Sequence, residues 1–250
     1  MAPFLILLIF LLPPHTRTAF LSVEIIGGQE AKPHSHPYMA FIKFLDGKKL
    51  RRCGGVLVTK KFVLTAAHCQ GSSMNVTLGA HNIQEHEKTQ QVIHVRQSIP
   101  HPDYTPQNFS NDIMLLQLKK NVKLSKAVQL LSLHEDMTQL NPGDTCHMAG
   151  WGRMSPSGPL ATKLQEVELT VQNELKCRSC MHVYSDDTEI CVGDPRIYKT
   201  GFKGDSGGPL VCNKVIQGIF SYGRKNGRPP AVFTKVSHFL PWIKKTMGHL

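Results

Sequence analysis

A serine flanked by glycines is the first residue in this sequence that could perform chemistry. It lies in the string Gly204-Asp205-Ser206-Gly207-Gly208-Pro209, where the absence of bulky neighbours would let a carbonyl group approach Ser206 closely. The backbone N–H groups of Gly204 and Ser206 could both point at a developing oxyanion. Taken alone, such a string is also compatible with an ordinary turn.

A nucleophilic serine needs a base, and the base needs an acid that orients it. The segment Thr65-Ala66-Ala67-His68-Cys69 offers His68 after an apolar run, and Asn111-Asp112-Ile113-Met114-Leu115-Leu116 offers Asp112 at the start of another. An aspartate in that position would be partly buried and would need a partner. A lone histidine or aspartate of this kind usually has a structural role, but the three segments together indicate nucleophilic acyl transfer.

The elements that must position these residues are short apolar runs separated by turn residues. Such runs span residues 38–45, 53–59, 112–118, 164–171, 209–212 and 215–222. Turn signals at intervals of about 8–12 residues are typical of an all-β sandwich or barrel. Residues 119–140 are the best candidate for a linker between two halves.

One helix is predicted, at the C-terminus. Ser237 can cap it, and Pro241 would lie in its first turn, where a missing N–H costs little. A shared apolar face is formed by Phe239, Leu240, Trp242, Ile243 and Met247. We expect this face to pack on the β body.

The composition excludes several classes of protein. With 250 residues, of which 41% are hydrophobic and 19% charged, the chain can build a packed core and is not expected to be disordered. No fixed repeat period indicates a solenoid or propeller. The apolar run Phe4–Leu12 has nine residues, whereas a membrane span needs about 20. We therefore interpret it as the core of a secretory signal peptide rather than an N-terminal strand.

Secretion predicts an oxidising compartment, which the seven cysteines fit. Two glycosylation sequons also fit it, at Asn75-Val-Thr77 and Asn108-Phe-Ser110.

The net charge is +11, and it persists without residues 1–24 because Arg17 and Glu24 cancel. A protein this basic should bind polyanions. No finger spacing or basic stripe with interleaved aromatics indicates specific nucleic-acid binding, so sulfated glycans or a granule proteoglycan are the expected partners. Pairs such as Lys48-Lys49 and Lys119-Lys120 are also compatible with a plain solvated surface.

Five segments together resemble the chymotrypsin-like serine proteases, specifically the granzymes of cytotoxic lymphocytes and related mast-cell proteases. They are Ile25-Ile26-Gly27-Gly28, Leu64-Thr65-Ala66-Ala67-His68-Cys69, Asn111–Leu116, Ala149-Gly150-Trp151-Gly152 and Gly204–Pro209. The resemblance covers residues 25–250 without a large gap, and the order histidine, aspartate, serine is that of the family.

The resemblance implies an all-β fold of two six-stranded antiparallel Greek-key barrels with a C-terminal helix and the triad in the cleft between the barrels. The barrels are expected at about residues 25–130 and 131–236, and the helix at about 237–248. Residues 1–24 would be a signal peptide plus a short activation propeptide.

The resemblance also implies the catalytic roles. Ser206 attacks the peptide carbonyl, His68 takes and returns its proton, and Asp112 orients His68. Gly204 and Ser206 supply the oxyanion N–H groups, and hydrolysis runs through an acyl-enzyme. Losing one such donor costs about 10²–10³ in rate, and losing the triad about 10⁶.

Activation is expected to follow cleavage after Glu24. Granzymes usually lose a two-residue propeptide to a dipeptide-removing protease, here Val23-Glu24 if the signal ends after Ser22. The freed ammonium of Ile25 would then pair with Asp205. A chain that keeps Glu24 is expected to be inactive.

Family pairing would join Cys53 to Cys69 and Cys146 to Cys212. Cys191 would pair with Cys177 or with Cys180, and we favour Cys177 because the loop is then closer in length to that of the family. Cys180 would be free or cross-linked to another molecule. The alternative is a zinc site built from Cys177, Cys180, His182 and Cys191.

By alignment with the family, the primary pocket has Thr200 at its base and Gly223 and Ala231 on its walls. It lacks the carboxylate that would pair with Lys or Arg and the arginine of aspartate-cleaving granzymes. An apolar Phe, Tyr, Leu or Met is therefore expected, and Ala231 could favour Leu or Met. Lys203 could favour acidic residues near the scissile bond, or be a solvated rim lysine.

These expectations define a secretory-granule serine endopeptidase of granzyme type, secreted or stored in cytolytic granules and acting on proteins or peptides. The alternative is a catalytically impaired, cationic binding protein on a protease scaffold. No metal or cofactor is predicted, although Glu85 and Glu87 lie where some relatives bind calcium.

Overall fold

The computed structural model describes residues 25–133, 139–181 and 183–248. The predicted signal peptide, the cleavage point after Glu24 and His182 lie outside these residues. No helix in the described part is long and apolar enough to cross a membrane.

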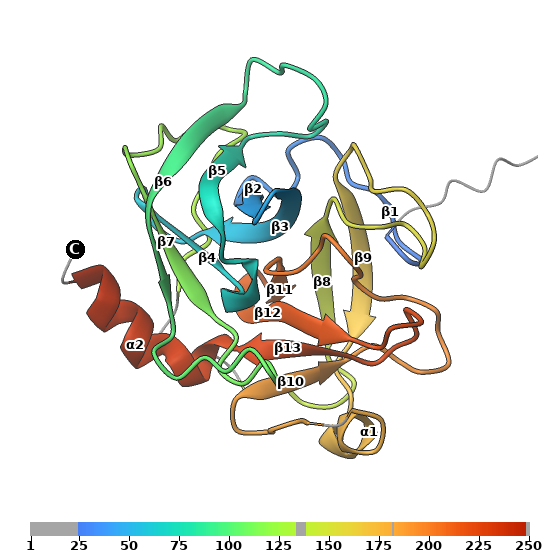
Figure 1. Ribbon diagram of the computed structural model, residues 1–250. Helices are drawn as coiled ribbons and strands as arrows, with labels where there is room; N and C mark the ends of the chain where they lie inside the picture. The colour runs from blue at the N-terminus through green and yellow to red at the C-terminus, as the bar shows by residue number, and fades with distance from the viewer. Residues whose placement is uncertain (1–24, 134–138, 182, 249–250) are drawn as a thin grey trace, which may run out of the picture.

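Six antiparallel strands close into a barrel in the order β2-β3-β4-β7-β6-β5 (Figure 1). They are β2 (Met39–Asp46), β3 (Lys49–Leu57), β4 (Phe62–Thr65), β5 (Ser72–Leu78), β6 (Gln91–Pro100) and β7 (Met114–Leu118). β2 pairs with β3 along its full length, and Gly47 turns the chain between them with a φ of 57°. This hairpin therefore reverses at Asp46-Gly47, the turn residues that follow the apolar run 38–45.

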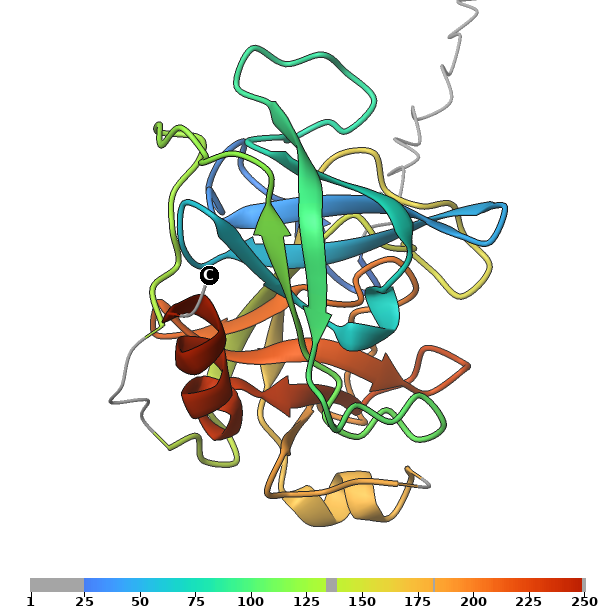
Figure 2. The same cartoon turned by 60° about the vertical axis from the view of Figure 1, so that its left-hand side comes forward.

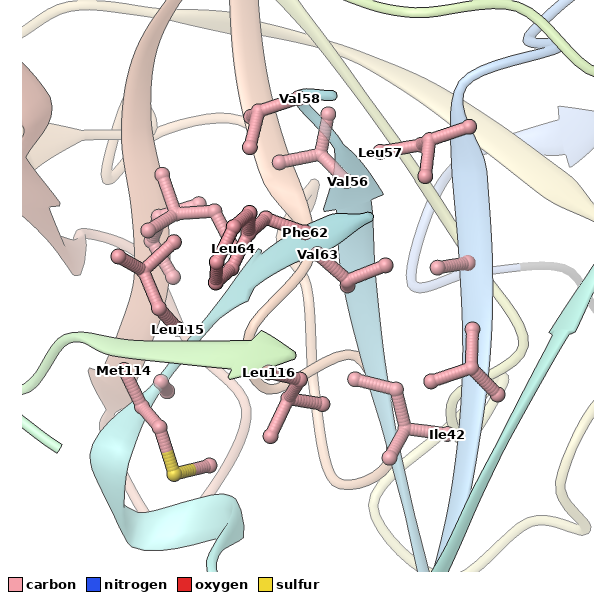
Figure 3. Packing of buried hydrophobic residues seen from close by; sticks show 14 of the residues in the cluster. Ile42, Val56, Leu57, Val58, Phe62, Val63, Leu64, Met114, Leu115 and Leu116 are labelled. Atoms are coloured by element: carbon pink, nitrogen blue, oxygen red, sulfur yellow. The ribbon is translucent and has the colours of Figure 1, made fainter. Parts of the chain in front are cut away.

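Side chains fill the barrel rather than leaving a channel. β4 and β7 are buried on both faces, so they appear in the sequence as continuous apolar runs. Figure 3 shows Leu64, Leu115 and Leu116 in one buried cluster with Ile42 of β2 and Val56 of β3. β4 and β7 carry the chain directly to His68 and away from Asp112.

The second half is a seven-stranded sheet in the order β1-β9-β8-β11-β12-β13-β10. Its strands are β1 (Gln29–Glu30), β8 (Thr145–Gly150), β9 (Gln165–Thr170), β10 (Glu189–Val192), β11 (Pro209–Cys212), β12 (Val215–Gly223) and β13 (Ala231–Lys235). An isolated bridge between Val171 and Val192 joins the ends of β9 and β10. The six strands β9-β8-β11-β12-β13-β10 correspond to the expected second barrel, and this single bridge is the contact that joins its first and last strands.

β1 is the element that departs from the expected division of the chain. It belongs to the range assigned to the first barrel, yet it pairs with β9 of the second sheet. The first described strand thus lies against the C-terminal half, and the chain then crosses to the first barrel.

The C-terminal helix α2 spans Val236–Gly248. Ser237 lies within its first turn instead of before it, so it is not the cap that we expected. Phe239, Leu240 and Ile243 are buried in the same hydrophobic cluster as the first barrel. Helix α2 follows β13 of the second sheet directly and packs on the first barrel, so it contacts both halves (Figure 2).

A second, five-residue helix, α1 (Glu174–Arg178), was not predicted. The side chain of Asn173 caps it by accepting a hydrogen bond from the Leu175 N–H. It carries Cys177, which is disulfide-bonded to Cys191 of β10.

The structure contains the disulfides Cys53–Cys69, Cys146–Cys212 and Cys177–Cys191, and Cys180 has a free thiol. The third disulfide occupies two of the thiols that the alternative zinc site would require. Cys53 and Cys69 also lie near His68 in a group of potential metal ligands, but their sulfurs are bonded to each other.

Candidate active site

His68 lies on a short 3-10 turn, Ala67–Cys69, that begins directly after β4. The disulfide from Cys69 to Cys53 ties this turn to β3. Just before the turn, the hydroxyl of Thr65 donates to the carbonyl of Gly54, also on β3, at 2.8 Å. The backbone around His68 is thus held on both sides.

Asp112 is completely buried, and its carboxylate is saturated with donors. Oδ1 accepts the His68 backbone N–H at 2.9 Å, and Oδ2 lies 2.7 Å from His68 Nδ1. The hydroxyl of Ser221 also donates to Oδ2, at 2.5 Å. Because an ionised carboxylate only accepts hydrogen bonds, Nδ1 carries the proton and Nε2 is left free to act as a base.

Ser206 lies on a tight turn pressed against the end of β4. Gly204 and Gly207 have φ angles of 101° and 80°, which favour glycine. A Cβ on Gly207 would stand 2.0 Å from the hydroxyl of Thr65, and the Gly54 N–H donates to the carbonyl of Ser206 at 2.7 Å. The serine is therefore placed beside the segment that carries His68.

Within the described residues, no hydrogen bond of 3.5 Å or less joins the hydroxyl of Ser206 to the His68 ring. In unliganded active sites this contact is often long and tightens when substrate binds. The structure thus forms the aspartate–histidine part of the predicted triad, with the serine turn beside it.

The backbone N–H groups of Gly204 and Ser206 have no acceptor in the part of the chain that the structure describes. Between them, the Asp205 N–H donates to the carbonyl of Phe202 at 2.9 Å. Two unused donors flanking one peptide unit form the arrangement expected for an oxyanion site.

Asp205 is buried beneath this turn. Its carboxylate oxygens accept the N–H groups of Gly152 at 2.7 Å and Phe202 at 3.0 Å. Burial raises the pKa of Asp205 to about 7, and no cation pairs with it among the described side chains. A Cβ on Gly150 or Gly152 would come within 2.2–2.3 Å of the Asp205 carboxylate.

Ile25 is completely buried in the hydrophobic cluster of the second sheet, together with Met148. In the unprocessed chain its nitrogen is a peptide amide and carries no charge. The expected ion pair between Ile25 and Asp205 therefore requires cleavage before it can form.

The three expected pocket residues lie in buried or paired backbone. Thr200 is buried, with its N–H bonded to the carbonyl of Ile26 at 3.1 Å. Gly223 and Ala231 are direct partners across β12 and β13, and a Cβ on Gly223 would lie 3.5 Å from that of Ala231. None of the three side chains is ionisable.

An aromatic group beside His68 was missed by the sequence analysis. The Phe109 ring stands edge-on to the His68 ring, with centroids 5.4 Å apart, and lies 5.8 Å from the Tyr222 ring. Phe109 has a φ of 61°, which is rare for a bulky side chain. The only sequence signal was its place inside the sequon at Asn108.

The two sequon asparagines differ in their surroundings. Asn75 lies on β5 and is half-buried, whereas Asn108 accepts the Ser110 N–H at 3.1 Å in the loop before Asp112.

Of the two carboxylates at the calcium position of some relatives, Glu87 accepts the N–H groups of His81 and Asn82 at 2.7 and 3.0 Å. Glu85 accepts the side-chain amide of Asn82 at 2.6 Å. The first carboxylate thus holds its own loop together.

Comparison with known proteins agrees with this geometry. The family model described as Trypsin matches residues 25–243. The chain is 63% identical to human granzyme H over the full length of both chains. It is 61% identical to human granzyme B over 99% of each. A solved structure titled "Structure of GrC" matches 90% of this chain and 100% of that one, with a TM-score of 0.87 and 54% identity.

Proposed function

Because the chain belongs to the trypsin family of serine proteases and is granzyme-like, we propose that it is a secretory-granule endopeptidase that cleaves after large apolar residues. The observation that carries the catalytic part is the Asp112 carboxylate, which binds both the backbone and the ring of His68. The protein substrates of a protease are its expected partners.

In this proposal the Ser206 hydroxyl attacks the substrate carbonyl as His68 Nε2 takes its proton. The oxyanion is held by the N–H groups of Gly204 and Ser206, each worth about 10²–10³ in rate. The imidazolium then gives the proton to the leaving amine, and water hydrolyses the acyl-enzyme by the same steps. Asp112, whose buried carboxylate accepts three hydrogen bonds, stabilises the imidazolium throughout.

Activation would follow removal of the segment ending at Glu24 by a dipeptide-removing protease. The new ammonium of Ile25 supplies the cation that the buried Asp205 carboxylate lacks. Since an unpaired buried charge costs about 3–5 kcal/mol, the pair can order the turn that presents Gly204.

The primary specificity follows from the neutral pocket. Burying a Lys or Arg against Thr200 would leave its charge unpaired, which is costly. Phe, Tyr, Leu or Met meets no such penalty, and the Ala231 methyl narrows the slot by an amount worth about 1–3 kcal/mol of discrimination.

A basic cleft of about 400 Å³ lies beside Gly204. Lys203, Arg52 and Arg153 line it together with Arg51 of the projecting β2–β3 hairpin (Figure 2). Burial and the nearby charge of Arg153 lower the pKa of Arg52. A bound anion would therefore offset the repulsion between the positive charges that line this cleft. It supports a preference for acidic substrate residues near the cleaved bond.

The charge of +11 supports storage on a granule proteoglycan or another sulfated glycan. Retention on a heparin column that weakens as salt rises is the expected result, because the attraction is screened. Elution at low salt would contradict it.

The decisive experiment treats the processed protein with a fluorophosphonate. Labelling that disappears in Ser206→Ala and persists in the exposed control Ser179→Ala supports an active protease. Absence of labelling in the wild type would favour the alternative, a cationic binding protein without catalysis. A positional-scanning peptide library then tests the preference for apolar residues.

A further inference from the structure

The aromatic pair Phe109 and Tyr222 forms a wall beside His68. Tyr222 directly precedes Gly223, a wall of the proposed primary pocket. Because Tyr222 and Gly223 are consecutive residues of β12, we expect the substrate residues that precede the pocket-filling one to lie next to Tyr222. The position of this wall therefore affects how peptide substrates bind.

The hydroxyl of Tyr222 ends against a carboxyl group that has no role in the proposed chemistry. Glu189 is the first residue of β10 and is 7% exposed. Its Oε2 accepts the Ser185 N–H at 2.9 Å, and its two oxygens lie 3.2 and 3.3 Å from the Tyr222 hydroxyl. On β13 it pairs with Thr234, whose hydroxyl donates to the carbonyl of Asp112 at 2.9 Å.

The count of protons shows which form of Glu189 suits this contact. The Tyr222 hydroxyl has one proton, and the carbonyl of Val183 lies 2.5 Å away as an acceptor. If Glu189 is ionised, two acceptors compete for that proton. If Glu189 is protonated, it donates to the Tyr222 oxygen while Tyr222 donates to Val183, and every polar atom is satisfied.

Burial and the negative charge of Asp112 favour the protonated form of Glu189, whereas the hydrogen bonds from Ser185 and Tyr222 act in the opposite direction and are outweighed by burial. No ion pair joins Glu189 to a cation among the described residues. Lys235, on β13, donates instead to the carbonyl of Asp186, whose carboxylate pairs with Arg178. Burial raises the pKa of Glu189 to about 7.

The proton can exchange with solvent through a cavity. A pocket of about 500 Å³ is lined by Glu189, Tyr184, Lys235 and Glu174, among other residues. Glu174 is the other carboxylate in this lining.

We propose that Glu189 is a positioning residue which, when protonated, donates a hydrogen bond to Tyr222 and holds the Phe109–Tyr222 wall in place for substrate residues that precede the pocket-filling one. Loss of the proton to solvent turns the donor into a second acceptor and loosens the wall. This inference rests on the proposed protease function.

The test compares two substrates that share the pocket residue and the leaving group, a single-residue amide and a tetrapeptide amide. Their ratio of kcat/KM cancels any effect of pH on the catalytic steps that the two substrates share. For the processed wild type we expect the tetrapeptide advantage to fall about fivefold between pH 6 and pH 8.5, the effect of one hydrogen bond.

Variants separate positioning from simple packing. In Glu189→Gln the amide still donates to Tyr222 and its oxygen still accepts from Ser185, so the advantage should stay high at every pH. Glu189→Leu should keep it low, and Glu168→Gln on β9 should retain the wild-type profile. A flat profile in the wild type, or an unchanged pH dependence in Glu189→Gln, would overturn the inference.

A readout without catalysis distinguishes this failure from failure of the proposed function. The infrared band of the protonated Glu189 carboxyl group is measured in Ser206→Ala protein and is identified by its absence after the further change Glu189→Gln. This band should disappear as the pH is raised, with a midpoint near pH 7. A midpoint below pH 5 overturns the inference even if the wild type hydrolyses both substrates. If neither substrate is cleaved, the band still decides the protonation of Glu189.

Discussion

The buried carboxylate of Asp205 should make the unprocessed chain lose stability as the pH rises. Burial raises its pKa from 3.8 to about 7. A carboxyl whose folded pKa is raised binds its proton more tightly in the folded state than in the unfolded state. Its favourable contribution is therefore complete below about pH 4 and is lost as the pH rises to about 7.

The magnitude follows from the shift of the pKa. Each unit corresponds to about 1.4 kcal/mol, so a displacement from 3.8 to about 7 is worth roughly 4 kcal/mol. Asp205 is fully buried, so solvent screening does not reduce this value. After cleavage, the ammonium of Ile25 would neutralise the carboxylate and remove the dependence on pH.

The assay is urea unfolding of Ser206→Ala protein, which cannot digest itself, at pH 4.5 and pH 7.5. Unprocessed Asp205 protein is compared with its Asp205→Asn variant. In the asparagine variant the side-chain NH2 group faces the N–H of Gly152 or Phe202, so two donors oppose each other. This lowers the stability equally at both pH values. Because the unfolded carboxyl is already largely ionised at pH 4.5, the difference between the two proteins should shift by about 3 kcal/mol in favour of asparagine at pH 7.5.

Groups such as Glu189 titrate in both proteins and cancel in this comparison. The same measurement on processed protein should show no such shift, and Asp205→Asn should then be less stable by about 3–5 kcal/mol because the ammonium has lost its partner. Equal pH slopes for the unprocessed pair, or a slope that survives processing, would show that Asp205 is not the group responsible.

Three further predictions concern the site and its support. Asp112→Asn should lower kcat about 10⁴-fold at neutral pH while substrate binding persists, because the amide offers His68 a donor and reverses its tautomer; steady-state kinetics would show it. Replacing Cys177 and Cys191 by alanine should cost about 3 kcal/mol in urea unfolding, as expected for a loop with a separation of 14 residues. Ala231→Gly should raise the kcat/KM ratio of Phe to Leu substrates about tenfold, and an unchanged ratio would remove Ala231 from the pocket.

The sequence predicted most where function depends on local motifs. The glycines around Ser206, the small residues before His68 and the apolar run after Asp112 each determine a short backbone conformation, so each could be recognised separately. The C-terminal helix was predicted almost to its boundaries because its apolar face recurs at helical spacing. The family resemblance supplied the remainder, including the disulfide of Cys177.

Contacts between distant segments were beyond such patterns. β1 has only two residues, too few for any alternation to indicate that it pairs with β9. Phe109 adopts a positive φ, which its residue type gives no reason to expect. Glu189 looks like an ordinary strand carboxylate, and only the folded chain reveals that a hydroxyl and an N–H from two other segments enclose it.

The hydrogen bonds that hold the catalytic residues cross between the two halves in both directions. Asp112 belongs to the first barrel, yet Ser221 of β12 and Thr234 of β13 donate to it from the second sheet. Ser206 belongs to the second half, yet Gly54 of β3 donates to its carbonyl from the first. Each half therefore helps to hold a catalytic residue of the other, and a change that shifts one half against the other would disturb both the nucleophile and the acid–base pair. Motifs that are each local in sequence thus acquire their chemistry only through this reciprocal support.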